Sequence, residues 1–409
     1  MRRSILAMAV ALVVVGCSRP APEMGTEIAA ADAAFAKTFQ ERLLDAKPGD
    51  VIEIPPGRHA FDRSLSLRAN GVTLRGAGMD KSVLTFKGQK AGAEGLLVNG
   101  DDFTIENLTI EDSNGDGLKI SESKNITIRS VKVHWTGGPS TRNGAYGLYP
   151  VLCKNVLIED SVAFGASDAG IYVGQSDGVI VRRSRAESNV AGIEIENTIN
   201  ADVYDNVATK NTGGILVFNM PGLSQQGGNI RVFNNQVIAN NTDNFGAKGT
   251  PVASVPAGSG VLVNSNDDIE IFGNTIANNV TANIIISSVY SAGYKDSSRS
   301  ETFDPYPENI YVHSNKLSGG GDSPDGLDLK ALKVALFGLR GSFPDVLWDG
   351  YYNAQRKVGT QVRGPDICLR DVNGVVNADG PGGYKNPDKD AKRFDCELPR
   401  LPAVDLGRG

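Results

Sequence analysis

Histidine and cysteine are scarce in this chain of 409 residues, which holds three His and four Cys. The histidines, His59, His134 and His313, lie far apart and form none of the close pairs that zinc sites use. We therefore expect no metal site. An excess of basic residues is also lacking, because 41 Lys and Arg stand against 47 Asp and Glu. The net charge of −6 argues against a nucleic-acid-binding surface.

The apolar run at the amino terminus is too short to cross a bilayer. It covers Ile5–Val15 after Arg2 and Arg3, whereas a membrane-spanning helix takes about 20 residues. A basic start before a short apolar run is typical of a secretory signal. The run ends in Val14-Val15-Gly16-Cys17, which resembles the bacterial lipobox and so implies that Cys17 is lipidated. We expect residues 1–17 to be a lipoprotein signal peptide; a cleaved secretory signal and an uncleaved anchor are the alternatives.

The residue after the lipobox bears on location. It is Ser18, whereas lipoproteins of this kind that stay at the inner membrane tend to carry Asp there. We therefore expect an outer-membrane lipoprotein that faces the periplasm or the cell surface. Several acyl chains, at about 0.8 kcal/mol per buried CH₂, would hold it firmly in the membrane.

What the chain does have is a repeated phrase between residues 103 and 317. β-forming residues alternate with polar ones, then Asn or Ser, a turn, Gly and an apolar pair follow. From Val156 to Val179 is 23 residues, and from there to Ala201 is 22. This period is too short for a strand–helix–strand unit, which needs roughly 30 residues, so it predicts a coil of stacked parallel strands. Longer spacings elsewhere are one period plus an insertion.

One position of the phrase is Asn in four successive copies, Asn206, Asn235, Asn274 and Asn315. Stacking in register would place these side chains on top of one another inside the coil. A buried amide without a partner costs about 1–3 kcal/mol, so we expect each amide to bond to the next. The alternative is that they are exposed turn residues.

Segments of different composition flank the repeat. Residues 31–47 predict an amphipathic helix, with Phe35, Phe39, Leu43 and Leu44 on one side, that covers the open end of the coil. The tail begins with a helix that we expect to start at Ser323-Pro324. We expect this tail to be a cap; a partner-docking module is the alternative.

This order of cap and repeats, over residues 35–317, resembles the pectate-lyase-like right-handed β-helix superfamily. The resemblance implies an all-β, right-handed parallel β-helix with an N-terminal helical cap and a small α/irregular C-terminal cap. It implies no single activity, because the superfamily includes lyases, hydrolases, epimerases, tailspikes and non-enzymes. The expected organisation is a signal peptide at 1–17, tether and capping helix at 18–48, β-helix at 49–317 and C-terminal cap at 318–409.

The other cysteines divide into two kinds. Cys153 follows a predicted strand and should be buried and inert. Cys368 and Cys396 lie 28 residues apart in the tail and should form a disulfide in an oxidising periplasm.

The second strand of each turn carries the candidate site. Its second and fourth residues are apolar and should point inward, so its third should point outward. Insertions beside these strands add aromatic and basic residues. Tyrosines suit sugar rings because they combine an apolar ring with a polar tip, so we expect a polysaccharide partner. Packing of the tyrosines under the loops is the alternative. The candidate catalytic residues are Lys119, Tyr149, Tyr172 and Glu194, and the candidate substrate-binding residues are Trp135, Arg142, Tyr146, Asp168, Glu196 and Phe218.

Two chemistries fit these residues. A uronate lyase or C5-epimerase needs a cation, Lys119 or Arg142, and groups that move protons, such as Tyr149. A hydrolase needs two carboxylates about 5–9.5 Å apart, and Glu194 and Glu196 on one strand would lie about 7 Å apart. Whether the protein is an enzyme stays open at this point. The rival function is a non-catalytic scaffold that docks another envelope protein on the same face.

Two further resemblances bear on activity. The segment Tyr146–Leu152 looks like the strand where periplasmic alginate C5-epimerases carry Asp-Pro-His-Asp, but here the residues are Tyr149, Pro150, Val151 and Leu152. Both acids and the His are missing, which argues against that epimerisation. Residues 143–147 and the C-terminal Cys pair resemble a family of bacterial β-helix lipoproteins without an assigned activity. We expect no cofactor, although Asn114-Gly115-Asp116 leaves Ca²⁺ open.

Overall fold

The computed structural model describes residues 33–292, 303–355, 357–358, 361–362 and 366–407. The predicted signal peptide, the lipidation site Cys17 and the tether lie outside these residues, so the lipid anchor and the outer-membrane location stay predictions. Among the described residues no helix is long and apolar enough to cross a bilayer.

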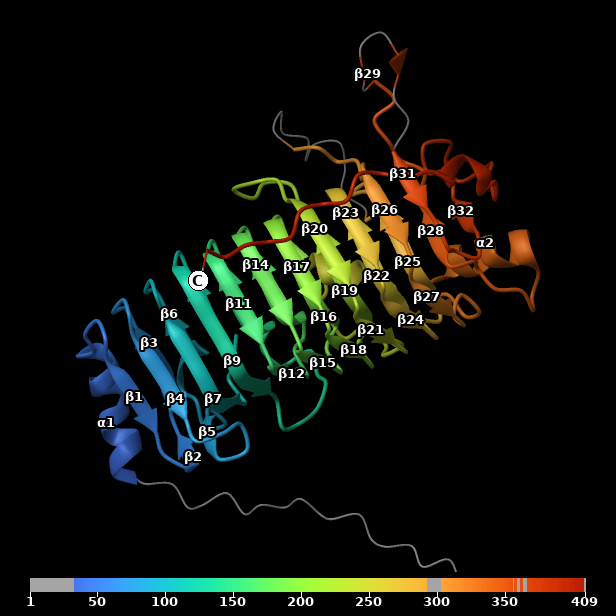
Figure 1. The fold of residues 1–409 in the computed structure, drawn as a ribbon. Coiled ribbons are helices and arrows are strands. Elements are labelled where there is room, and N and C mark those ends of the chain that lie inside the picture. Colours follow the sequence, from blue (N-terminus) through green and yellow to red (C-terminus); the bar gives the residue numbers. More distant parts are fainter. Residues whose placement is uncertain (1–32, 293–302, 356, 359–360, 363–365, 408–409) are drawn as a thin grey trace, which may run out of the picture.

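Two parallel β-sheets, of 19 and 11 strands, run the length of the molecule and form a solenoid (Figure 1). One turn supplies β11 (Lys154–Glu159) and β12 (Val162–Phe164) to the larger sheet and β13 (Ala169–Gly174) to the smaller. The next turn repeats this order and pairs in parallel with it, with Val156 opposite Val179. The predicted coil of parallel strands is confirmed.

The other strands follow the same scheme. The rest of the larger sheet consists of β1 (Val51–Ile54), β2 (Gly57–Ala60), β4 (Thr73–Gly76), β5 (Ser82–Thr85), β7 (Thr104–Glu111), β9 (Lys124–His134), β14 (Asp177–Arg182), β15 (Arg185–Glu187), β17 (Ile199–Tyr204), β18 (Val207–Thr209), β20 (Gly228–Phe233), β21 (Gln236–Ile238), β23 (Asp267–Phe272), β24 (Thr275–Ala277), β26 (Ile310–His313), β27 (Lys316–Ser318) and β31 (Ile367–Leu369). The rest of the smaller sheet consists of β3 (Arg63–Leu67), β6 (Ala91–Val98), β8 (Leu118–Ser121), β10 (Tyr146–Val151), β16 (Ala191–Glu196), β19 (Gly213–Phe218), β22 (Ser259–Asn264), β25 (Ala282–Ser287), β28 (Val346–Trp348) and β32 (Val375–Asn377). A two-stranded antiparallel hairpin, β29 (Lys357–Val358) and β30 (Gln361–Val362), projects from the carboxyl-terminal end.

The core lies between the sheets and stacks like on like. Inward-pointing Ile171, Ile193 and Ile215 occupy equivalent positions on successive turns and are fully buried. A single turn cannot bury its own apolar residues. The turns before and after it cover them, so burial of the core depends on stacking. β-Branched residues fit this pleated surface, which explains their dominance in the strands.

The predicted Asn ladder is confirmed. Asn206 donates from Nδ2 to Asn235 Oδ1 (3.0 Å), Asn235 to Asn274 (2.9 Å) and Asn274 to Asn315 (3.0 Å). A second, parallel ladder joins Asn189, Asn211, Asn240 and Asn279 by the same bonds (3.0, 2.9 and 3.2 Å). The sequence signal for it is simple, because three of its members each follow a first-ladder Asn by five residues.

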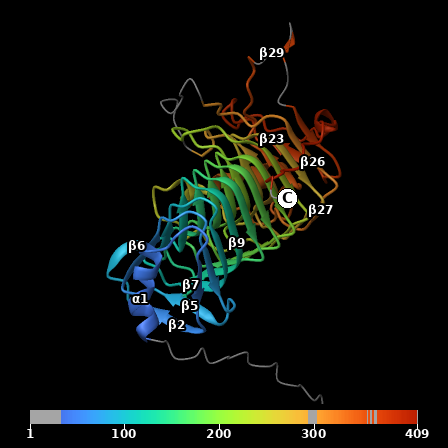
Figure 2. The ribbon, with the colours of Figure 1, turned by 60° about the vertical axis from the view of Figure 1, so that its left-hand side comes forward.

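Caps close both ends. The helix α1 (Ala33–Leu44) lies across the amino-terminal end (Figure 2) and buries Phe35, Phe39 and Leu43. Leu44 was expected on the same side but is 66% exposed, because one helical step turns it away from the coil. At the other end α2 (Leu327–Phe337) begins after Gly326, not at Ser323-Pro324 as expected, because Gly326 has a φ of 80° that is incompatible with helix.

The two tail cysteines form a disulfide, Cys368–Cys396, and Cys153 is free and buried, as predicted. Burial raises the pKa of the Cys153 thiol to about 11, which keeps it unreactive. Beyond the disulfide, residues 397–407 run back along the outer face of the larger sheet (Figure 1). We call this segment the C-terminal strap.

Candidate functional site

The outer face of the smaller sheet changes from open to covered between two neighbouring strands. One outward-pointing position stacks from turn to turn, with Lys119 opposite Tyr149 and Tyr172 opposite Glu194. On β3, β6, β8 and β10 this position is half-buried, whereas from β13 onward it is at most 7% exposed. We call this position the outer column. It comprises Ser66, Leu97, Lys119, Tyr149, Tyr172, Glu194, Leu216, Leu262, Ile285, Leu347 and Val376.

Three tyrosine rings meet at this boundary. The ring centroid of Tyr146 lies 4.4 Å from that of Tyr149 and 4.4 Å from that of Tyr172. Tyr149 and Tyr172 meet edge to face at 5.0 Å. The Lys119 ammonium lies 5.0 Å from the Tyr149 ring centroid, a cation–π contact. Tyr172 is only 4% exposed, so Tyr149 and Tyr146 present the aromatic surface.

Four carboxyl groups lie beside the tyrosines. Asp116, just before β8, accepts a hydrogen bond from the Tyr146 backbone N–H (3.2 Å). Asp168, just before β13, accepts one from the Tyr146 side chain. Glu196 accepts one from the Tyr172 hydroxyl (2.9 Å). Glu194 is 3% exposed, and its Oε2 has no hydrogen-bond partner among the described residues.

Burial holds protons on these groups. Desolvation raises the pKa of Asp168 to about 7; repulsion from Glu196 adds to this, and the hydrogen bond from Tyr146 opposes it. Desolvation also raises the pKa of Asp116 to about 6, against the hydrogen bond from Tyr146. The pKa values of Glu194 and Glu196 are raised by burial as well. A carboxyl group with a pKa near neutrality can donate a proton at physiological pH.

Two insertions that are far apart in the sequence form a roof over part of this cluster. Thr141 Oγ1, in the loop before β10, donates to the carbonyl oxygen of Phe245, in the loop before β22 (2.9 Å). Three strands, β13, β16 and β19, lie between β10 and β22 in the sheet, so the bridge spans the turns that carry them. Val252 and Val255 of the second loop pack in an apolar layer with Tyr172.

The structure brings most of the predicted residues together. The ones in or beside the cluster are Lys119, Tyr146, Tyr149, Asp168, Tyr172, Glu194 and Glu196. The expected wall of accessible groups is only partly present, however. Tyr172 and Glu194 point outward as expected but are buried, and Tyr172 packs with residues of the inserted loops, so the packing alternative holds for this tyrosine.

The other three predicted residues lie elsewhere. Trp135 is 4% exposed in the main core, and its indole N–H donates to the Ser113 carbonyl (2.8 Å), so it offers no surface to a substrate. Phe218 is 5% exposed within the apolar layer outside the smaller sheet. Arg142 is exposed on the loop before β10.

Asp116 was not selected for chemistry from the sequence. It stands two residues before Leu118, just as Tyr146 stands two before Leu148, and these leucines are opposite each other in the sheet. Asp116 and Tyr146 therefore occupy equivalent positions of successive repeats, and an alignment of the repeats could have identified Asp116. In the turn raised for Ca²⁺, the Asn114 side-chain nitrogen donates to the Gln89 carbonyl (3.0 Å). Among the described residues no three His, Cys, Asp or Glu side chains gather as metal ligands.

Comparison with known proteins identifies the fold. Residues 94–276 match a family model described as "Right handed beta helix region". This chain is a right-handed parallel β-helix. The resemblance noted from the sequence is thus confirmed at the level of fold. No curated protein matches the sequence.

Three solved structures illustrate what this chain is similar to. The Azotobacter vinelandii mannuronan C-5 epimerase AlgE4 A-module is 17% identical, with a TM-score of 0.46, over 72% of this chain and 86% of that one. Pectate lyase Pel9A is 15% identical, with a TM-score of 0.44, over 69% and 71%. An alginate lyase from Paenibacillus sp. str. FPU-7 is 15% identical, with a TM-score of 0.40, over 70% and 96%. At such identities the likeness concerns the fold alone.

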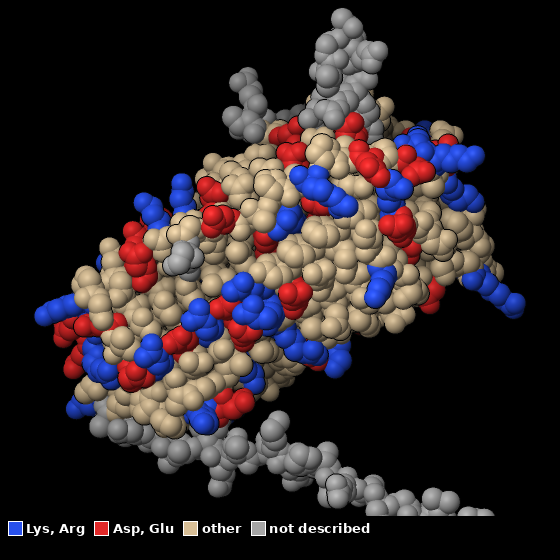
Figure 3. Space-filling view, in the orientation of Figure 1, with Lys and Arg blue, Asp and Glu red and all other residues tan. Residues whose placement is uncertain are grey.

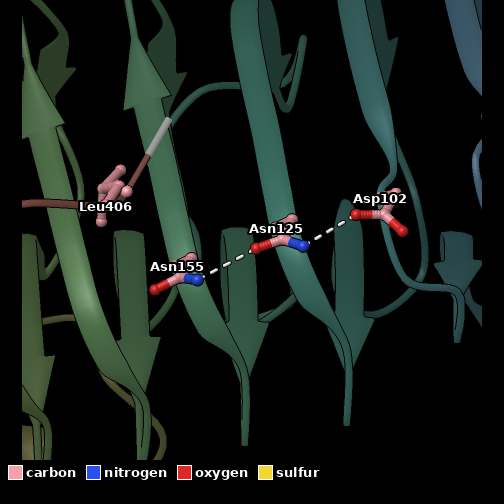
Figure 4. Close-up of a pocket in the computed structure, with 5 residues that line it drawn as sticks. Asp102, Asn125, Asn155 and Leu406 are labelled. Carbon is pink, nitrogen blue, oxygen red and sulfur yellow. Dashed lines mark hydrogen bonds between the residues drawn. The ribbon is translucent and has the colours of Figure 1, made fainter. Parts of the chain in front are cut away.

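A hollow on the larger sheet of the β-helix lies away from the tyrosines. Asp102, Asn125, Asn155, Leu406 and Gly407 line it (Figure 4). Asn155 donates to Asn125 (3.0 Å) and Asn125 to Asp102 (2.7 Å), so the side-chain amides bond to one another. With a single carboxylate it offers no acid–base pair, and the tyrosine–carboxyl cluster remains the candidate site.

Proposed function

We propose that this protein binds a neutral polysaccharide at the tyrosine cluster and cleaves it by acid–base hydrolysis. The observation that carries the proposal is a cluster of three tyrosine rings beside carboxyl groups whose pKa values lie near neutrality, about 6 for Asp116, which bonds to the Tyr146 backbone, and about 7 for Asp168, which bonds to the Tyr146 side chain. The exposed rings can pack on the C–H faces of a sugar. A protonated carboxyl can protonate the glycosidic oxygen while an ionised one activates water.

Charge favours a neutral glycan over a polyuronide. The cluster holds Asp116, Asp168 and two buried Glu, and the cation in contact with its rings is Lys119. An incoming uronate carboxylate would be repelled by each ionised acid, and lyase or epimerase chemistry needs positive charge to stabilise the enolate. Among the chemistries considered from the sequence, hydrolysis of an uncharged sugar chain fits best.

The docking alternative is less well supported on this face. A protein interface has an apolar core that is depleted in charge. Here the apolar members of the outer column from Leu216 onward are already covered by the chain's own loops and α2. The partly exposed residues of the cluster itself include Lys119 and two tyrosines, Tyr146 and Tyr149.

Release of reducing ends from neutral polysaccharides tests the proposal. Asp168→Asn and Asp116→Asn should each slow release about 10²–10⁴-fold, because each removes a proton-transferring group. Tyr149→Ala should weaken glycan binding at least about tenfold, a cost near 1.4 kcal/mol. Glu122→Gln, an exposed acid after β8, is the matched control and should behave as wild type.

Two results would contradict the proposal. One is cleavage that persists at the wild-type rate in both Asp→Asn variants. The other is unsaturated-uronate absorbance produced from a polyuronide, with no activity on neutral chains, because this would show lyase chemistry on an acidic substrate.

A further inference from the structure

We infer that the site accepts the end of a glycan chain and not its interior, an inference that rests on the proposed function. The observation behind it is the break in the outer column between Tyr149 and Tyr172. On the β10 side the column is accessible, and on the β13 side it is sealed. A chain that follows the column therefore meets a wall at the tyrosines.

The wall is continuous across the rest of the smaller sheet. From β13 to β32 each outer-column residue is at most 7% exposed. The cover is protein: Met220, Val252 and Val255 come from inserted loops, and Leu332 and Leu336 come from α2. The layer is apolar and packed, so it leaves no track for a hydrated sugar chain. The layer covers every strand of the smaller sheet from β13 onward, so a glycan chain cannot continue past the tyrosines on that side.

The side of the cluster is closed as well. The bridge from Thr141 to the Phe245 carbonyl crosses the turns ahead of β13, β16 and β19. Asp168, just before β13, is 9% exposed. The reacting bond must therefore be brought to Asp116 and Tyr149 from the remaining direction, along β8, β6 and β3.

In that direction the outer column is partly exposed. Ser66, Leu97 and Lys119 lead to Tyr149 along three strand spacings, about 14 Å in all. Glu94 on β6 and Asn99 just after it flank them and are half-buried. This stretch can hold several sugar units on one side of the reacting bond, whereas the wall leaves little room on the other. The expected products of such an arrangement are short pieces released from one chain end.

Linear and cyclic oligosaccharides of the same linkage make the sharpest test, because a cyclic glycan has no ends. The probes are neutral β-glucan, xylan and mannan oligosaccharides, with cyclic β-glucan and its linear counterpart as the matched pair. We expect the full chain to bind linear hexamers and to bind the cyclic form at least about 30-fold more weakly. End-labelled linear chains should lose their sugars from one end only.

Ser66→Trp tests the direction of approach. The bulky side chain on β3 should weaken binding of hexamers by about tenfold and leave disaccharides unaffected, because short ligands do not reach it. Gln236→Trp, at an exposed position of β21 in the larger sheet, is the matched control and should change neither.

The outcomes separate this inference from the proposed function. Equal binding of the cyclic and linear glycans, or release of internal fragments from long chains, overturns end-on binding while the proposed function stands. No binding of any neutral glycan overturns both. Hexamer binding that is lost in Gln236→Trp and kept in Ser66→Trp would place the chain on the other sheet and also overturn the inference.

Discussion

At the scale of the residue, the cluster around Tyr146 lowers the stability of the fold, because it buries acidic side chains. Asp168, Glu194 and Glu196 are acids held close together with little solvent, and burial raises the pKa of each. A structural network would pair such acids with cations, as Glu159 is paired with Arg129, Arg182 and Arg183 on the larger sheet. Burial alone would raise the pKa of Glu159. Hydrogen bonds from the three arginines outweigh this effect and lower the pKa to about 2. The contrast is typical of a functional site.

This contrast predicts how stability depends on pH. Well below pH 4 Asp168 is protonated in both the folded and the unfolded chain and costs no stability. As pH rises from about 4 to about 7 the unfolded carboxyl ionises first, so the folded state loses stability. The total loss is roughly 4 kcal/mol by pH 8. Asp168→Asn should therefore stabilise the protein at pH 8 and change little at pH 4, as measured by urea unfolding.

The control for this experiment is Asp160→Asn, because Asp160 is half-exposed and paired with Arg183. It should cost less than about 1 kcal/mol at either pH. A stabilisation by Asp168→Asn that is the same at pH 4 and pH 8 would show that ionisation of Asp168 is not its cause.

At the scale of the element, each strand position of the β-helix extends into a column along the rod. One outer column of the larger sheet begins with Glu53, Arg75, Glu106, Arg129, Glu159 and Arg182, which alternate in sign and are joined by ion pairs. It continues as Tyr204, Phe233, Phe272 and His313, whose rings stack 4.7, 4.9 and 5.2 Å apart. Figure 3 shows the two signs of charge interleaved over the amino-terminal half of this face. Such columns keep neighbouring turns in register.

The inner Asn ladders should contribute most to that registration. Asn211 donates to Asn240 and to the Ala186 carbonyl and accepts from the Asn189 backbone N–H, all inside the coil. Asn211→Ala leaves several buried groups without partners, at about 1–3 kcal/mol each. We expect the free energy of unfolding to fall by about 3 kcal/mol, measured in urea.

A surface ladder provides the comparison. Asn125 also bonds to its neighbours but is exposed and has a φ of 58°. Asn125→Gly removes the amide without straining the backbone, so it should cost less than about 1 kcal/mol. Equal losses in the two variants would mean that burial of the ladder does not matter.

At the scale of the whole molecule, the C-terminal strap ties distant turns together. The Leu401 backbone N–H donates to Glu270 on β23 (3.0 Å), and that of Val404 donates to Asp202 on β17 (3.2 Å). Arg400 forms an ion pair with Glu270 (2.8 Å). Both carboxylates are at most 3% exposed, so the strap satisfies groups that would otherwise be buried with fewer partners. The disulfide Cys368–Cys396 fixes the point where the strap begins.

Removing the strap should loosen the larger sheet. A chain ending at Glu397 loses the contacts to Glu270 and Asp202, and we expect its free energy of unfolding to fall by about 2–4 kcal/mol. Amide hydrogen exchange should accelerate on β17, β20 and β23 and stay unchanged on β13 and β16.

Glu270→Gln, made in the full chain and in the chain ending at Glu397, completes a double-mutant cycle. The substitution should cost more in the full chain than in the truncated one, because only the full chain supplies Arg400 and Leu401. Equal costs in the two backgrounds would show that the strap does not interact with Glu270 in solution.

The amino-acid sequence by itself determined the fold of this protein. The period of 22 and 23 residues, the alternation within each phrase and the recurring Asn specify which side chains point inward and which turns lie in register, since these follow from local geometry. They placed Lys119, Tyr149, Tyr172 and Glu194 correctly on one column. Accessibility along that column was decided only by the tertiary structure. On that column Glu194 is buried and Tyr149 is half-buried. Loops about a hundred residues apart meet outside the sheet, as where Thr141 bonds to Phe245, and a strand pattern holds no information about what folds over it.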